Sequence, residues 1–198
     1  MDFVRNVAKP LFETWGYEVK ILRSEKTYMD IFNHVITKPR KHASHKGQRY
    51  GFAVTGKCSV NRDLKLKPIM DYYKSLEKEP YVQYVGICAD EPLRLKSLHK
   101  DSRKISLLEE YGYTENMAYE LCKKYGLLSP CYNFSRRGGC WFCPNAKLEE
   151  QRQVFELYPE VWNTFVSLEK ELNLANAKWN VYGESLTERD KILRGKLQ

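Results

Sequence analysis

Three features of the 198-residue sequence predict an α/β fold. Residues 3–15 carry apolar side chains at helical spacing, residues 17–22 alternate apolar and polar side chains as a strand does, and residues 27–36 again fit a short helix. Residues 81–89 form an apolar run, and continuous burial of this kind suits a central parallel strand. We therefore expect a parallel or mixed sheet that contains residues 17–22 and 81–89, with helices on its faces.

The remaining segments follow the same pattern. Residues 61–76 predict a helix with Pro68 near its start, and residues 114–125 predict one with Thr114 as N-cap and Gly126 beyond its end. Residues 147–174 predict two helices hinged near Tyr158 and Pro159. We expect an α/β body over residues 1–125 and a cysteine-bearing C-terminal lobe over residues 126–198.

Composition and charge limit the function classes. The chain is 42% hydrophobic and 29% charged, which favours a globular fold over disorder. Because charged residues interrupt the N-terminal segment and no apolar run approaches about 18–20 residues, we expect a cytoplasmic protein with no membrane association. The 33 Lys and Arg against 25 Asp and Glu give a net charge of +8, which favours an anionic partner such as a nucleotide, a sulfate or a nucleic acid.

Basic residues concentrate in one stretch, residues 38–50. Pro39, Gly47 and the shortage of apolar residues predict a solvated loop there. Two interpretations are open, an electropositive lip over a bound anion and an ordinary surface loop.

The sharpest local motif is a CxxC pair, Cys140 and Cys143. Thiols stay reduced in the cytosol, so clustered cysteines there indicate a metal or redox chemistry rather than disulfides. Two thiolates three positions apart in a turn can hold one metal ion, and Gly138 and Gly139 allow the tight backbone that such a turn needs. A CxxC pair that acts alone, as a redox pair or without function, is the alternative.

A complete tetrahedral site needs two further ligands. Cys88 lies in the apolar run and Cys122 in a predicted helix, which indicates ordinary buried thiols. Cys131 and Cys58 lie in predicted loops and are the natural remaining ligands. The expected metal ligands are therefore Cys58, Cys131, Cys140 and Cys143, and four thiolates suit either zinc or a [4Fe–4S] cluster.

Further polar residues are candidates for binding an anionic substrate. Three lie near one helix start, three follow the apolar run at the edge where open α/β sheets bind ligands, and two flank the CxxC motif. The alternatives are a solvated basic face for the first group, and a helix cap with a local ion pair for the second. These candidates are Arg62, Lys65, Lys67, Asp90, Glu91, Arg94, Arg136 and Arg137.

Three segments carry a likeness to a known family. The run SPCYNFSRRGGCWFCPNA over residues 129–146 resembles the C-terminal signature of phosphoadenosine phosphosulfate (PAPS) reductase-like proteins, and most closely their phage and anaerobe branch. Residues 58–68 and 86–95 resemble two further segments of that family, in the same order. The likeness spans roughly residues 1–183 and implies a partial adenine-nucleotide α-hydrolase-like sheet.

Two departures from that family are evident. The chain has no Ser-Gly-Gly-x-Asp-Ser loop to cradle nucleotide phosphates, and residues 186–198 contain no cysteine nucleophile. The likeness thus implies the family's body without its first β-loop-α unit. Three explanations are open: a truncated chain, a loop supplied by another polypeptide, or an abandoned nucleotide site. We expect an unusually apolar face where that unit would lie, and self-association or a loop-bearing partner chain.

The likeness implies chemistry on an adenine nucleotide or sulfonucleotide, as an oxidoreductase or a sulfurtransferase, and it assigns no catalytic residue. Two alternatives stand beside it. One is a basic, metal-stapled module that binds nucleic acid through residues 38–50, and the other is a non-catalytic partner subunit.

Overall fold

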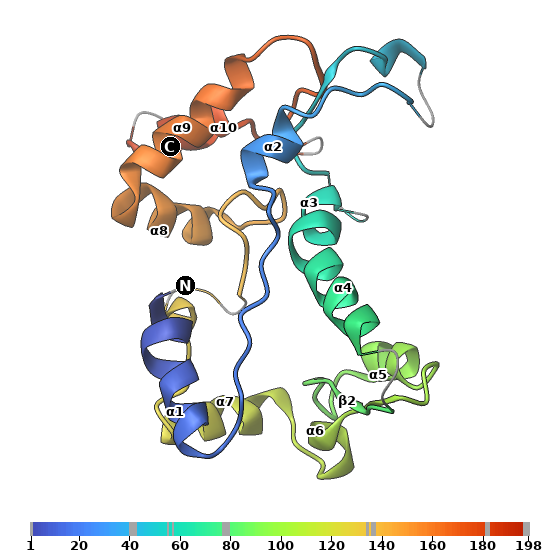
Figure 1. Cartoon of the computed structure of the whole chain (residues 1–198). Coiled ribbons are helices and arrows are strands. Elements are labelled where there is room, and N and C mark those ends of the chain that lie inside the picture. Colours follow the sequence, from blue (N-terminus) through green and yellow to red (C-terminus); the bar gives the residue numbers. More distant parts are fainter. Residues whose placement is uncertain are drawn as a thin grey trace. The chain divides into compact units, whose positions relative to one another are not determined.

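The computed structural model describes residues 2–39, 43–54, 56, 58–76, 80–133, 135, 138–180 and 183–195 (Figure 1). The chain forms two compact units. The first unit comprises Met1–Ile21 and Tyr72–Pro130, and the second comprises Leu22–Asp71 and Cys131–Gln198. This division differs from the expected one at residue 125, because residues 22–71 pair and pack with the C-terminal segment.

The first unit is mostly helical and contains one small parallel sheet. Strands β2 and β3 pair with Gln83 opposite Lys104 and Tyr84 opposite Ile105. Its small core consists of Ile87, Leu95 and Leu98. Its elements are a π-helical segment, Val4–Ala8, then α1 (Lys9–Thr14), β2 (Gln83–Tyr84), α5 (Pro92–Leu98), β3 (Lys104–Ile105), α6 (Leu107–Glu110) and α7 (Glu115–Lys124).

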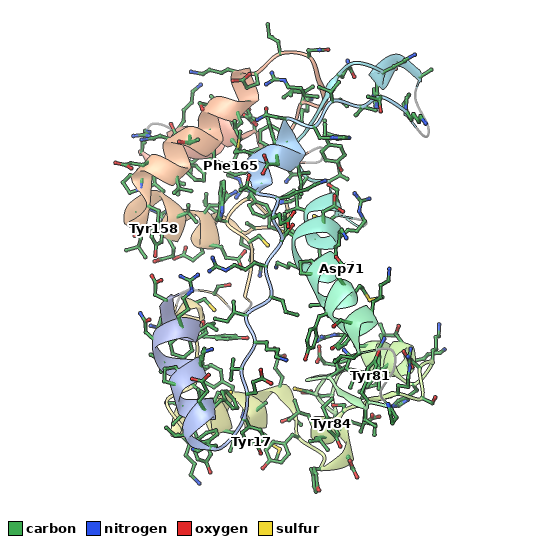
Figure 2. The ribbon with its side chains drawn as sticks, viewed as in Figure 1. Tyr17, Asp71, Tyr81, Tyr84, Tyr158 and Phe165 are labelled. Atoms are coloured by element: carbon green, nitrogen blue, oxygen red, sulfur yellow. The ribbon has the colours of Figure 1, made fainter. Side chains whose placement is uncertain are left out.

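The expected central sheet is not formed among the described residues. Residues 17–22 lie in no strand, and of residues 81–89 only Gln83 and Tyr84 do. Tyr17 and Tyr84, both labelled in Figure 2, are each 64% exposed. A segment with an alternating pattern forms a strand only where a neighbouring strand completes its backbone hydrogen bonds. Residues 17–22 have no such neighbour in the part of the chain that the structure describes.

The second unit also pairs two strands that are distant in sequence. Strands β1 and β4 run parallel, with Arg49 opposite Leu174 and Gly51 opposite Asn176. Its helices and strands are α2 (Tyr28–Phe32), β1 (Arg49–Gly51), α3 (Ser59–Asn61), the π-helical segment Arg62–Leu66, the start of α4 (Lys67–Ser75), α8 (Leu148–Leu157), α9 (Pro159–Ser167), β4 (Leu174–Asn176) and α10 (Leu186–Leu193). Short 3-10 turns lie at Ala43–His45, Pro130–Asn133 and Leu168–Lys170.

An aromatic core holds the second unit together. Phe165, labelled in Figure 2, projects from α9 and is fully buried. Its ring centroid lies 5.9 Å from that of Phe52 and 6.4 Å from that of Trp179, both in edge-to-face geometry. Helices α8, α9 and α10 pack on one another beside this core. Burial of several large rings makes this core the main source of the unit's stability.

Most predicted helices are confirmed. The hinge lies at Tyr158, after which Pro159 begins α9, and the Thr114 side chain accepts the Met117 N–H at the start of α7. Gly126 has φ +67°, as a residue beyond a helix end often does. The helix expected over residues 27–36 is shorter, because α2 ends at Phe32. No helix within the described ranges is long and apolar enough to cross a membrane.

Candidate metal centre

The CxxC motif forms a tight turn in the second unit. The Cys143 N–H donates to the Cys140 carbonyl at 3.0 Å, and the Ala146 N–H donates to the Cys143 carbonyl at 2.9 Å. The predicted turn is therefore present. Neither Gly138 nor Gly139 has a positive φ, so this turn forms without a left-handed glycine.

The two residues between the cysteines anchor this turn to the aromatic core. The Phe142 ring stacks on Tyr28 with centroids 4.4 Å apart, and the Trp141 ring lies edge-on to Phe165 at 5.1 Å. The indole N–H of Trp179 donates to the Phe142 carbonyl at 3.3 Å. Both side chains and backbone thus fix where Cys140 and Cys143 lie.

Cys58 reaches the same core from a distant part of the sequence. Its side chain caps α3, and the Asn61 N–H lies 3.5 Å from Cys58 Sγ. Cys58, Cys140 and Cys143 are all partly buried and pack against one core cluster. Cys131 belongs to the same unit and lies in the 3-10 turn Pro130–Asn133.

The structure does not show a completed metal centre. Among the described residues, no three Cys, His, Asp or Glu side chains are grouped so as to hold a metal ion. The convergence of Cys58, Cys131, Cys140 and Cys143 on one ion therefore stays a prediction. The donor set itself, thiols in a partly buried setting, fits zinc or an iron–sulfur cluster.

Two buried hydroxyl groups of the second unit have no hydrogen-bond partner in the part of the chain that the structure describes. Tyr28 Oη and Ser59 Oγ have no hydrogen-bond partner among the described residues, and both residues are 7% exposed. Burial and the nearby Cys58 raise the pKa of Tyr28. Sequence reasoning missed both residues, since no local pattern marks a buried hydroxyl as unpartnered.

The basic candidates of the second unit are mostly paired with acids. Arg62 holds Asp63 through two hydrogen bonds of 2.5 and 2.9 Å, and this contact lowers the pKa of Asp63. Lys67 Nζ lies 2.7 Å from an Asp71 carboxylate oxygen. Lys65 has no ion pair in the part of the chain that the structure describes. Of these three candidates, Lys65 is the cation most available to an external anion.

The acidic candidates belong to the first unit and accept backbone hydrogen bonds there. Asp90 accepts the Glu115 N–H at 3.0 Å, at the beginning of α7. Glu91 accepts the Cys88 N–H at 3.1 Å and pairs with Arg94. The ion pair of Arg94 agrees with the second alternative. Asp90, however, does not cap the helix that follows it, because the N-cap of α5 is Glu91, which makes no side-chain cap hydrogen bond.

Arg136 and Arg137 lie outside the described residues, as do Arg40, Lys41 and His42 of the basic stretch. Within that stretch Arg49 belongs to β1 and not to a solvated loop, and it pairs with Glu171 at 2.8 Å.

We expect Cys88 to react more slowly with alkylating reagents than Cys122, the other thiol of the first unit. Burial, with smaller effects of nearby acids, raises its pKa, so a smaller fraction is reactive thiolate at a given pH. At pH 8 we expect iodoacetamide to modify Cys88 several-fold more slowly than the half-buried Cys122, as followed by peptide mass spectrometry. In urea the two rates should converge. Equal rates in the native protein would contradict the burial of Cys88.

Comparison with protein-family models, with curated proteins and with solved structures finds no match to this chain.

Proposed function

We propose that this chain is a metal-stapled α/β protein of the PAPS reductase-like class. Its second unit would hold zinc or a [4Fe–4S] cluster through Cys58, Cys131, Cys140 and Cys143. One observation carries the proposal: Cys58 and both CxxC cysteines, far apart in sequence, border the same aromatic core. A metal bound there would clamp residues 58–61 to the C-terminal segment and stabilise the unit.

The feature of the fold that supports this proposal is the parallel pairing of its strands. Both small sheets are parallel, and parallel strands require crossover connections such as those of α/β folds. We propose that they are parts of a partial adenine-nucleotide α-hydrolase-like sheet. The substrate would be an adenylylated or sulfated nucleotide, and a loop-bearing chain would supply the phosphate cradle. The reaction would be that of an oxidoreductase or a sulfurtransferase.

Metal analysis tests the first part of the proposal. The full chain, purified under anaerobic conditions, should contain close to one zinc ion, or iron and sulfide in cluster proportions, per chain. A colourless zinc protein indicates a structural staple, whereas a broad band near roughly 400 nm with iron indicates a cluster. A protein that binds neither metal, before or after reconstitution, would refute the proposal.

Lys65 offers a test of nucleotide binding. Lys65→Ala should weaken binding of adenosine 5′-phosphosulfate several-fold in calorimetry, because an unpaired cation near a helix start can meet the anion. Lys67→Ala is the matched control, since it removes the same charge from a lysine already paired with Asp71. Equal effects would indicate general electrostatics. Steeply salt-dependent binding to random-sequence DNA, with no nucleotide binding, would favour the nucleic-acid module instead.

The first unit supports the proposal of a partner. It has only a small core and leaves large side chains exposed, including Tyr84 at 64%, Tyr111 at 71% and Leu93 at 84%. Exposed apolar side chains mark an interface where they form a contiguous patch. We propose that a loop-bearing chain, or a second copy of this one, covers it. A protein that is monomeric by light scattering and retains no such chain during purification would contradict this.

A further inference from the structure

Charge is divided unequally between the two units. The first unit contains 12 Lys and Arg against 12 Asp and Glu, so its formal net charge is zero. The second contains 21 Lys and Arg against 13 Asp and Glu, and it therefore carries the whole net charge of +8. Within it, residues 31–62 hold seven Lys and Arg and no acidic residue. An anionic partner is therefore attracted to the second unit, and to this stretch in particular.

Residues 34–50 form an arm of two antiparallel segments. The Ile36 N–H donates to the Gln48 carbonyl, and the Gly47 N–H donates to the Ile36 carbonyl, both at 2.9 Å. These hydrogen bonds, with an isolated antiparallel bridge beside them, close the loop of residues 37–46. Figure 1 shows the arm, coloured blue to cyan, extending from α2 on the side away from α9.

The base of the arm is fixed to the C-terminal segment. Arg49 lies in β1, and the parallel pairing of β1 with β4 joins the arm to that strand. The Arg49 guanidinium donates to the Glu171 carboxylate and to the Leu172 carbonyl, both at 2.8 Å. The Asn173 side-chain amide donates to the Gly47 carbonyl at 3.3 Å. Because its base is already ordered, the arm loses less conformational freedom when it binds a partner.

The loop of the arm offers hydrogen-bond donors and no acidic group. Residues 37–46 have the sequence TKPRKHASHK, of which residues 40–42 lie outside the described ranges. Lys38 and Lys46 are exposed, and neither has an ion pair with a described residue. Basic and hydroxyl side chains are among the groups that contact phosphate oxygens in nucleic-acid complexes. The loop lacks the aromatic and large aliphatic residues that anchor protein interfaces and membrane-surface helices.

We infer that this arm binds duplex DNA by placing its loop at the major groove, where Lys38 and Lys46 contact backbone phosphates. The major groove of B-form DNA, about 12 Å wide, admits a two-stranded β-ribbon, whereas that of duplex RNA is too narrow. Phosphate contacts carry no sequence information, so the binding has little sequence preference. The inference goes beyond the proposed function, because neither the metal centre nor the nucleotide takes part in it.

Fluorescence anisotropy with a short random-sequence DNA duplex tests the inference on the full chain. The logarithm of the binding constant should fall linearly with the logarithm of salt concentration, with a slope of about −0.9 for each phosphate contact. The double variant Lys38→Gln/Lys46→Gln should make this slope shallower by about 1.8 and weaken binding on the order of 10-fold or more near 0.1 M salt. A duplex RNA of the same sequence should bind more weakly than the DNA.

The matched control is the double variant Lys178→Gln/Lys191→Gln. It removes the same charge from two exposed lysines of the second unit that lie outside the arm. Its affinity for DNA and its salt slope should change far less. Equal losses for the two double variants, duplex RNA bound as tightly as DNA, or no binding of duplex DNA at low salt would each overturn the inference.

Further measurements separate this inference from the proposed function. Both double variants should retain the circular dichroism, the metal content and the affinity for adenosine 5′-phosphosulfate of the wild type. A wild-type chain that binds metal and nucleotide but no DNA would overturn this inference alone. A chain that binds DNA through the arm, but neither metal nor nucleotide, would overturn the proposed function alone. Loss of nucleotide affinity in Lys38→Gln/Lys46→Gln would make the arm a lip over the nucleotide and would also overturn the inference.

Discussion

Replacement of Cys140 by serine is expected to remove most bound metal and to lower the melting temperature by about 10 °C. In the proposed centre the metal joins Cys58 to the C-terminal segment, so its binding free energy is also folding free energy. Structural zinc sites contribute on the order of 10 kcal/mol, and loss of one of four ligands should forfeit several of these. In a chain of this size each kcal/mol corresponds to about 2–4 °C. Elemental analysis and thermal melts measure both effects.

Two controls separate metal loss from a packing defect at Cys140. Cys122→Ser changes a half-buried thiol on α7 of the first unit and should leave metal content unchanged. Cys88→Ser should also leave it unchanged, although burial of the new hydroxyl can lower stability. With a strong chelator present, wild type and Cys140→Ser should melt at the same temperature. A difference that persists there would assign the effect to packing against the core.

Gly51→Ala is expected to destabilise the second unit by about 3 kcal/mol or more. Gly51 pairs with Asn176 between β1 and β4 and has φ +82°, a conformation that residues with a Cβ rarely adopt. An added Cβ would lie 2.4 Å from the Asn176 carbonyl oxygen, closer than any real contact. Since that same oxygen accepts the N–H of the buried Phe52 at 2.9 Å, movement to relieve the clash would disturb the core.

Gly47→Ala isolates the clash from the backbone strain. Gly47 has φ +81°, yet a Cβ there would meet nothing within 4 Å. Gly47→Ala should therefore lower the free energy of unfolding only by the strain of the left-handed conformation, about 1–2 kcal/mol. Urea unfolding followed by circular dichroism measures both variants. Similar losses of unfolding free energy for Gly47→Ala and Gly51→Ala would contradict this. They would show that β1 and β4 can move apart to admit the Cβ without disturbing the core.

The sequence by itself determined the features that depend on near neighbours. Thr114 marks the start of α7, and the Tyr158–Pro159 junction separates α8 from α9, because caps and proline act within one helical turn. The turn between Cys140 and Cys143 is likewise local. The hydrogen bonds that form these features join residues only a few positions apart, so the pattern of residue types suffices to predict them.

Only the tertiary structure decided which distant segments meet. Residues 17–22 have the alternation of a strand but form none, whereas Arg49 in the basic stretch pairs with β4, because strand formation depends on a partner that local pattern does not name. The division into two units and the burial of the unpartnered Tyr28 hydroxyl have the same origin. Each depends on side chains brought together across long stretches of chain, and burial, unlike helix capping, is a property of the whole unit.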